Sequence, residues 1–369
     1  MQPLDPESNY TDAAVLDALR GRYGTRTMSY RYDRLNQSNV FIEPIDCVVS
    51  GSVSNNALAD IKRTGRFRIL DRSGINYLKD RIKPWARLAM PDGGFVEWPL
   101  GVFLLATPSR TLDGNGIVAR NVEAYDQLLV LKRSKIADRY TIAAGTTYVA
   151  AIATVAASFS YLIVPSSLTL PAALEWEPGT TWLRILNDLL GAINYESAWF
   201  DESGRLICRP YQSPAVRASE YDYEADEFSV ITGDIEQTLD LFDIPNRWVL
   251  VKSNPDESLL KGTYTNVNPA SLTSTVSRGE IITDFRTEQD AADQSTIDAK
   301  AARLGFEASQ VFENIQISTA AMPMHSNADV VKLAIPGLAV DDKYSEHMWT
   351  LPLAPGARMT HTVRRVVTV

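Results

Sequence analysis

Three histidines are the residues of this chain that could most readily support catalysis or metal binding. They are His325, His347 and His361, and their spacing matches no metal-binding motif and no HExxH motif of zinc proteases. We interpret each one as a hydrogen-bonded structural residue at a loop or strand end. The sequence also contains no GxSxG motif, no phosphate-binding loop and no GxGxxG motif after a strand.

An acidic segment offers a second kind of chemistry, because a glycosidase needs two carboxylates that face each other across a cleft. Asp222, Glu224, Asp226 and Glu227 could supply such a pair. We expect this segment to be a polar, exposed loop, which disfavours catalysis there. Asp201 and Glu202 precede Ser-Gly and are interpreted as hairpin-turn residues. The sequence therefore predicts no enzyme, no catalytic, cofactor-binding or metal-binding residue, and no cofactor.

The tryptophans and cysteines are interpreted as residues that pack in the core or at interfaces. The tryptophans are scattered along the chain, which favours core and interface anchors over a single sugar-binding platform. They are Trp85, Trp98, Trp176, Trp182, Trp199, Trp248 and Trp349. Cys47 and Cys208 form no CxxC motif and are predicted to be free core thiols. The first residues show no basic start and no apolar run, so we expect no secretory signal and synthesis in a reducing cytoplasm.

Charge is distributed unevenly along the chain. The net charge of −9 disfavours general nucleic-acid binding, because phosphate contacts require Lys and Arg. Residues 60–90 nevertheless hold nine Lys and Arg residues against three Asp residues, whereas residues 218–243 hold nine acids and no base. Two interpretations stay open. The two segments are either solvated faces or complementary surfaces that meet, within one chain or between subunits.

Strand signals dominate the first part of the chain. Residues 1–28 are predicted to be an N-terminal arm with a short helix near residues 12–20. Residues 29–135 alternate apolar and polar side chains, with hairpin turns at 91–94 and 113–116 and a short helix near 125–133. Short strands at this spacing predict a first barrel-like β domain.

The middle of the chain predicts an inserted α+β domain, residues 136–225. Its uncharged segment, 140–174, is long enough to suggest a membrane span. Gly145 and Pro165 interrupt this segment, and Thr, Ser and Ala are frequent in it, so we predict a short buried helix followed by a strand. Apolar residues at helical spacing from Trp182 to Leu190 predict a second helix that ends at Gly191.

Strand signals return in residues 226–369, which are predicted to form a second barrel-like domain with a helix near 288–310. Acidic residues at the start of that helix suit the positive end of the helix dipole. Strands are expected at 236–242, 246–252, 278–285, 313–318, 330–335, 347–353 and 359–369, with a long hairpin or loop at 254–276. The predicted fold class is α+β, mostly β, with two barrel-like antiparallel β domains and an inserted α+β domain.

The order of short sequence phrases resembles that of hub-type minor tail proteins of long-tailed bacteriophages, particularly those that infect actinobacteria. The resemblance covers most of the chain. The phrases are IKRTGR at 61–66, IKPW at 82–85, WPLGVF at 98–103, NDLL at 187–190, WFDESG at 199–204, DIPNRW at 243–248, MPMH at 322–325 and MTH at 359–361. None of them is a catalytic motif in that family, so no active-site residue carries over.

This resemblance implies a structural role, similar to that of the central hub of contractile-tail baseplates. Three chains of such a hub form a homotrimeric ring with pseudo-sixfold symmetry, each with two related β-barrel domains. The implied partners are the tail tube or a distal tail protein above, and a tip spike, fibre or receptor-binding protein below. We expect a virion protein at the tail tip, assembled in the host cytoplasm, with no membrane-spanning segment. DNA would pass transiently without specific binding, because acidic walls repel phosphate.

Two alternatives stay open at this stage. A receptor- or glycan-binding tail-tip protein would need an exposed aromatic cluster around a pocket. A tail-associated cell-wall hydrolase would need a catalytic domain, which hub proteins can carry as a C-terminal extension. Since the sequence ends at Val369, directly after the second strand-rich region, we expect no such extension.

Overall fold

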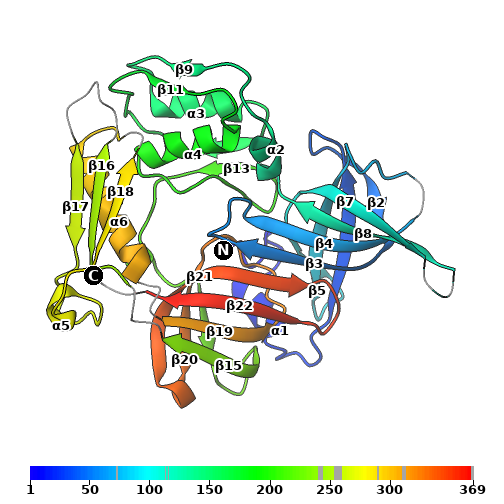
Figure 1. Ribbon diagram of the computed structural model, residues 1–369. Helices are drawn as coiled ribbons and strands as arrows, with labels where there is room; N and C mark the ends of the chain where they lie inside the picture. The colour runs from blue at the N-terminus through cyan, green and yellow to red at the C-terminus, as the bar shows by residue number, and fades with distance from the viewer. Residues whose placement is uncertain are drawn as a thin grey trace.

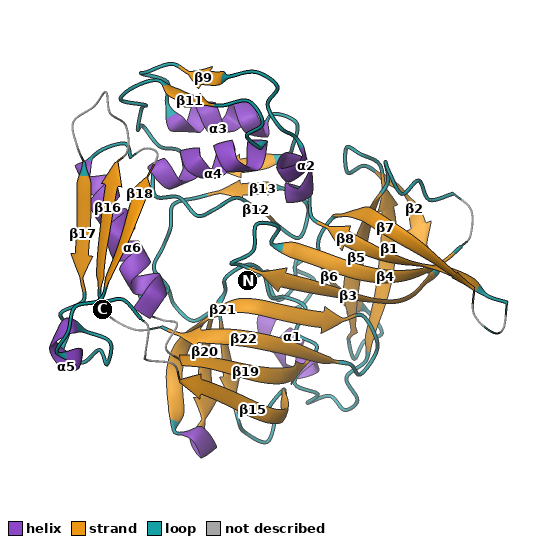
Figure 2. Ribbon diagram, in the orientation of Figure 1, coloured by secondary structure: helices purple, strands orange, loops and turns teal. Residues whose placement is uncertain are grey.

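The computed structural model describes residues 1–71, 74–112, 114, 116–239, 244–252, 260–288, 291–309 and 313–366. One large sheet dominates it and passes through both strand-rich regions (Figures 1 and 2). Two smaller units, each with helices and its own short strands, lie beside this sheet. The mostly β, α+β fold class that the sequence predicts is confirmed.

The first half of the large sheet consists of antiparallel strands joined mainly by short turns. They are β1 (Met28–Leu35), β2 (Phe41–Ile45), β3 (Val48–Asn56), β4 (Arg63–Leu70), β5 (Arg81–Ala89), β6 (Phe95–Pro99), β7 (Phe103–Leu112) and β8 (Val118–Tyr125). Their order is β3-β4-β8-β7-β5-β1-β2, with β6 beside β5. The β5–β6 hairpin turns where predicted, and Gly93 there has a φ of 88°, which suits glycine. Residues 113 and 115 of the other predicted turn lie outside the described residues.

The second half of the same sheet contains β14 (Tyr221–Glu224), β15 (Ile231–Leu239), β19 (Glu313–Ala320), β20 (Val330–Ile335), β21 (Val340–Pro352) and β22 (Arg358–Arg365), with a short 3-10 turn at Pro336–Leu338. The long strand β21 joins the halves, because its residues 348–352 pair with residues 52–56 of β3. β14 pairs in parallel with β20. Residues 240–242 of a predicted strand lie outside the described residues.

A single apolar core follows from this continuity. It contains Phe67, Trp98 and Phe103 from the first half together with Tyr344 and Trp349 from the second half. The predicted N-terminal helix is α1 (Asp12–Leu19), which begins after Thr11, whose side chain caps the amide of Ala14. Val15, Ala18 and Leu19 of α1 are buried in the same core, so the N-terminal arm is part of the packed structure.

The inserted unit has an apolar core of its own. It contains α2 (Leu128–Arg133), α3 (Tyr148–Ala156), α4 (Trp182–Ala192), β9 (Tyr140–Ile142), β10 (Tyr161–Ile163), β11 (Leu174–Trp176), β12 (Trp199–Phe200) and β13 (Leu206–Cys208). The prediction that Gly191 ends the second helix is wrong, because α4 continues through Ala192 and Asn194 adopts the left-handed conformation. Within the described residues, no helix has the length and apolar character needed to cross a bilayer.

A third unit contains β16 (Arg247–Lys252), β17 (Lys261–Thr265), β18 (Thr283–Glu288), α5 (Thr275–Arg278) and α6 (Gln294–Ser309). The predicted helix near 288–310 is α6, and the side chain of Asp293 accepts a hydrogen bond of 2.7 Å from the amide of Thr296 in its first turn. Helix and sheet approach closely at Gly262, where an added Cβ would lie 2.5 Å from the carbonyl oxygen of Ile297. Strands predicted for the second barrel-like domain therefore form a separate sheet, with Trp248 and Leu250 in its core.

The strand order of the large sheet can be compared with the two predicted barrels. Its strand order runs from β15 at one end to β2 at the other, and no sheet among the described residues closes on itself. The two strand-rich regions share one open sheet and one core. The domain boundaries at residues 28, 135 and 225 stay predictions.

Candidate functional site: a buried histidine–carboxylate cluster

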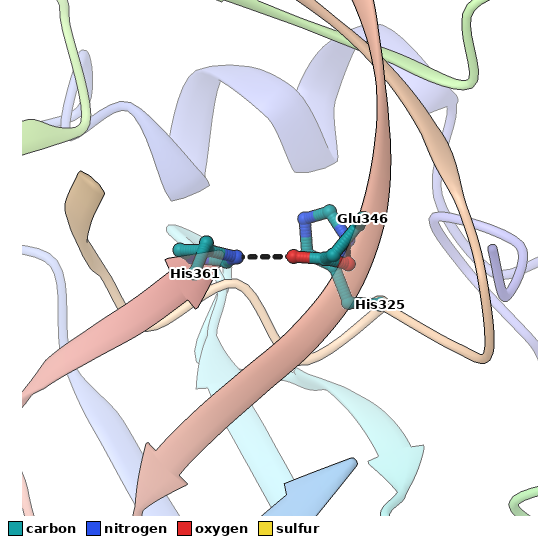
Figure 3. Close-up of side chains that lie close together, drawn as sticks. All are labelled: His325, Glu346 and His361. Atoms are coloured by element: carbon teal, nitrogen blue, oxygen red, sulfur yellow. Dashed lines mark hydrogen bonds and ion pairs between the residues drawn. The ribbon is translucent and has the colours of Figure 1, made fainter. Parts of the chain in front are cut away.

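The structure brings two of the three histidines together with a carboxylate. His325 lies in the segment between β19 and β20, Glu346 lies on β21 and His361 lies on β22 (Figure 3). β21 and β22 are paired, and their register shifts between Glu346 and Met348. The three side chains are almost completely buried, with 1%, 1% and 2% of their surface exposed.

Glu346 bridges the two imidazole rings. Its Oε1 lies 2.5 Å from Nδ1 of His361, and its Oε2 lies 2.8 Å from Nδ1 of His325. Asp329 adds a second carboxylate, whose Oδ2 lies 3.1 Å from Nδ1 of His325 and accepts a hydrogen bond from the amide of Ser326. Because a carboxylate only accepts hydrogen bonds, Nδ1 of both histidines carries a proton.

The remaining ring nitrogens contact hydroxyl groups. Nε2 of His325 lies 2.7 Å from the hydroxyl of Tyr223, and Nε2 of His361 lies 2.8 Å from the hydroxyl of Thr319. Tyr223 also stacks on His325, with the two rings only 7° from parallel. All four nitrogen atoms of the two histidines therefore have partners, which come from three strands and one loop.

Electrostatics divide the cluster into charged and neutral members. Burial opposes a charge on His325, but Glu346 and Asp329 outweigh it and raise the pKa of His325 to about 10. Burial also opposes the charge on Glu346, yet the two histidines hold its pKa below the usual value. Burial lowers the pKa of His361. At neutral pH the cluster therefore contains an imidazolium at His325, a carboxylate at Glu346 and a neutral ring at His361.

Asp329 completes the charge balance. Its Oδ1 lies 2.8 Å from the amino group of Met1. Burial opposes ionisation of Asp329, but His325 and that amino group hold its pKa well below the usual range. Two carboxylates therefore face two cations inside the core, which is the condition under which buried charges are tolerated.

Two histidines and a glutamate are also a ligand set that zinc uses. The ligand atoms of His325, Glu346 and His361 all lie within 4.8 Å of one another. The distances of 2.5 and 2.8 Å from Nδ1 to the carboxylate oxygens are short, however. Ligands placed at about 2.0–2.1 Å from a tetrahedral ion lie about 3.3 Å apart. The geometry therefore fits direct hydrogen bonds, and the cluster acts as an ionic clamp between β21, β22 and the 325–329 loop.

A second buried ion pair connects this loop to the inserted unit. Glu202 accepts hydrogen bonds from Arg63 of β4, at 2.5 Å, and from the hydroxyl of Ser326, at 2.6 Å. The carbonyl of Ser326 accepts a hydrogen bond from the indole of Trp349. Glu202 lies in the hairpin turn between β12 and β13, as predicted, and its buried side chain has this additional role. Asp201 stabilises the same turn, because its side chain accepts hydrogen bonds from the amides of Ser203 and Arg205.

The other candidate residues do not converge on a site. Asp222 and Glu224 point outward on β14, and Asp226 and Glu227 are exposed after it, so the segment is partly a strand where a loop was expected. His347 lies apart from the cluster, and burial together with Arg364 lowers its pKa to about 3. Five tryptophans are buried, while Trp85 and Trp182 are half-buried. Cys47 and Cys208 are buried, as predicted, and within the described residues neither forms a disulfide.

The sequence contained one signal for the cluster. His361 lies two residues from both Met359 and Val363 on β22, so the period-two pattern places its side chain on the same buried face. A buried histidine requires partners, but the partners themselves are set by strand pairing between residues that are 15 positions apart in the case of Glu346 and His361. No sequence motif predicts that pairing.

Comparison with known proteins gives a consistent result for the fold. No protein-family model matches the sequence, and no curated protein matches it. A tail protein from Neisseria meningitidis has a similar structure, with a TM-score of 0.64 and 11% identity over 91% of this chain and 97% of that one. A 43 kDa prophage tail protein from Shewanella oneidensis gives 0.61 and 9% over 91% and 98%.

A prophage tail protein from Listeria monocytogenes is also similar, with a TM-score of 0.53 and 12% identity over 90% of this chain and 94% of that one. At such low identities the likeness establishes the fold alone. The chain therefore has the fold of solved phage tail proteins along nearly its whole length.

Proposed function

We propose that this chain is a structural virion protein, the tail-tip or baseplate hub of a long-tailed phage. Three copies would form a ring that joins the tail tube to the tip spike or fibres and lines the DNA channel. The observation that carries this proposal is the fold, which matches two solved tail proteins over 91% of this chain and 97–98% of theirs. A host among the actinobacteria stays an expectation from sequence resemblance.

The histidine cluster supports a structural role over an enzymatic one. Each of its three side chains is buried, and each ring nitrogen contacts a neighbouring side chain. A catalytic group must reach the substrate, whereas these groups hold strands together. Burial of Trp98, Trp248 and Trp349 also removes three residues from the aromatic platform that a glycan-binding protein would need.

The large sheet offers two edges for assembly. β2 ends the sheet on one side and exposes Phe41 and Ile42, with 56% and 44% of their surface accessible. β15 ends it on the other side. An exposed apolar edge strand is a liability for an isolated protein, and pairing with a neighbour in a ring removes it.

Charge complementarity suggests which surfaces of neighbouring copies of the chain face each other in the ring. Several basic residues of segment 60–90 are engaged within the chain, including Lys62 with backbone carbonyls and Arg63 with Glu202. Arg66 and Arg68, in contrast, line an open groove over β3, β4, β7 and β8. The exposed acids of the acidic segment 218–243 are Asp222, Glu224, Asp226, Glu227, Asp234 and Glu236. In the proposed ring, this acidic surface faces either the groove of the next copy or the channel, where it repels DNA.

Light scattering coupled to size-exclusion chromatography tests the ring directly. A trimer would have three times the protomer mass of 40.8 kDa. The variant Arg66→Glu/Arg68→Glu would shift the protein toward the monomer if the groove contacts the acidic surface. The control variant Arg139→Glu/Arg184→Glu reverses two exposed arginines of the inserted unit and would leave the mass unchanged.

Two results would contradict the proposal. One is a protein that stays monomeric at every concentration and does not associate with purified tail tubes. The other is lysis of bacterial cell walls by the purified protein in a zymogram, which would favour the hydrolase alternative. Antibody labelling of intact virions would locate the chain, with label at the tail tip as the expected outcome.

A further inference from the structure

A cavity of about 270 Å³ lies where four parts of the chain meet. The segment between β3 and β4 contributes Lys62, and the segment after β13 contributes Tyr211. Helix α6 contributes Arg303, and the second half of the large sheet contributes His347 on β21 and Arg364 on β22. In Figure 2, β13 of the inserted unit, α6, and β21 and β22 of the large sheet lie around the centre of the molecule. The cavity is separate from the histidine cluster and does not depend on the proposed tail role.

Two of the cations in this cavity have no acidic partner within ion-pair distance among the described residues. Lys62 donates hydrogen bonds to the carbonyls of Ala57 and Ala59, at 2.7 and 3.1 Å. Arg364 donates from Nε to the side-chain oxygen of Asn314, at 3.1 Å. Burial lowers the pKa of both Lys62 and Arg364, which shows that their charges lie in a poorly solvated environment.

The acids that line the cavity are already neutralised by other arginines. Glu307 pairs with Arg303 at 2.8 Å, and Glu196 pairs with Arg209 at 2.9 Å. Arg217, which also lines the cavity, pairs with Glu220. These pairs cancel, so Lys62 and Arg364 leave an excess of positive charge at the cavity.

Three buried polar atoms of residues that line the same cavity have no hydrogen-bond partner within the part of the chain that the structure describes. They are the hydroxyl of Tyr211 and both ring nitrogens of His347. The Tyr211 ring also lies 4.1 Å beneath the guanidinium of Arg303, which holds it in place. Buried polar groups in native proteins are normally satisfied. Tyr211 and His347 line a positively charged cavity, and the Tyr211 hydroxyl and the single N–H of the neutral His347 ring are donors, so they indicate a ligand that accepts hydrogen bonds.

We propose that this cavity binds a small oxyanion, either inorganic phosphate or a small carboxylate. Arg364 presents a guanidinium whose fork of N–H groups matches such anions, and Tyr211 and His347 supply further donors. The negative charge of the anion compensates Lys62 and Arg364. The cavity is smaller than the roughly 300–1,000 Å³ of sites for drug-sized ligands, which suits a small ion. Since its walls come from four parts of the chain, the anion would link the inserted unit and α6 to the large sheet.

Thermal unfolding of the full chain tests the site, with potassium phosphate, sodium citrate and sodium chloride compared at matched ionic strength. An anion that binds only the folded state stabilises it by RT ln(1 + c/Kd), where c is the free anion concentration, so Tm keeps rising with anion concentration. We expect phosphate or citrate to raise the Tm of the wild type by several degrees over chloride and to raise that of Arg364→Gln by less, because the general effect of these salts acts on both proteins alike. Calorimetry would give the dissociation constant. Binding of phosphate alone would identify a phosphate site, and binding of citrate alone a carboxylate site. No difference from chloride for either anion would overturn the proposal.

The variant Arg364→Gln is expected to weaken binding at least tenfold. Arg358→Gln is the matched control, because Arg358 lies on the same strand but is exposed outside the cavity. If Arg364→Gln fails to fold, Tyr211→Phe removes only a hydroxyl and should weaken binding several-fold. NMR chemical shifts of the His347 ring report binding at the cavity directly, because a general change in protein stability does not alter them. A bound anion should shift the His347 resonances, and unchanged resonances under saturating phosphate and citrate would count against the site.

Discussion

Glu97 in the first half of the large sheet and Glu346 in the second half each bridge two basic side chains, yet their surroundings differ. Glu97 pairs with Arg31 and Arg87, whose side chains are about one-third exposed at 35% and 32%. Glu346 pairs with His325 and His361, which are almost completely buried. Water screens the first bridge, whereas the second one lies in the core.

The two halves of the sheet therefore hold their cores in different ways. In the first half, Phe67 packs edge-on against Tyr32 and Phe103, and its ring covers Gly51 and Gly65. The stability of that core depends on how closely these apolar side chains fit together. The second half places hydrogen-bonded charges among its apolar residues, so it depends on every partner being present. Buried ionic groups of this kind add little net stability but are costly to disrupt, because the remaining charge stays buried.

The largest expected effect is that of Glu346→Gln. The substitution preserves shape but removes the charge that faces His325, and it places an amide beside two donor nitrogens. We expect the free energy of unfolding to fall by about 3–5 kcal/mol, as for other broken buried ion pairs. Urea denaturation followed by tryptophan fluorescence measures this. A loss below about 1 kcal/mol would contradict the assignment of the cluster as an ionic clamp.

Gly65→Ala tests the shape-dependent core of the first half. An added Cβ would lie 2.9 Å from the ring of Phe67, so the ring must move. Overpacking of this kind costs about 1–3 kcal/mol. The same denaturation experiment measures the loss. In a double-mutant cycle, Gly65→Ala should cost less in the Phe67→Leu background than in the wild type, since the smaller side chain relieves the contact. An unchanged stability in Gly65→Ala would mean that the core adapts without strain.

The pH dependence of stability separates the two halves further. Folding raises the pKa of His325 from 6.5 to about 10, so its stabilising contribution is complete below about pH 6.5 and is lost as the pH rises through about 10. Between pH 7 and 10, this single proton contributes a decrease in unfolding free energy of up to about 1.4 kcal/mol per pH unit. His325→Gln should flatten the profile in this range. A variant whose slope equals that of the wild type would show that other groups cause the decline.

The smallest expected effect is that of Glu97→Gln, the matched change on the surface of the first half. Exposed ion pairs contribute about 0–1 kcal/mol and are screened by salt. We expect a loss within this range that disappears in 1 M sodium chloride. The effect of Glu346→Gln should persist in the same salt, because the buried cluster is not screened. Equal salt sensitivity of the two variants would remove the distinction between the two bridges.

Local structure was largely predictable from particular residues. The β5–β6 turn follows from Asp92 and two glycines, and α6 begins where Asp293 can cap it. The alternation of β4 is visible in its sequence, with Arg66 exposed and Phe67 buried. The end of α4 was less predictable, because Gly191 and Asn194 both suit a helix terminus and packing selected the second.

The sequence by itself determined the fold class, the hairpins, the helix caps and the negative net charge, because these depend on neighbouring residues and on composition. Tertiary structure alone decided that β21 joins β3, that residues 246–288 form a separate sheet with α6, and that Glu202 meets Arg63. It also decided that His325, Glu346 and His361 share one buried site. These contacts join residues far apart in the chain, and they are selected by the burial of a whole core, which no local pattern encodes.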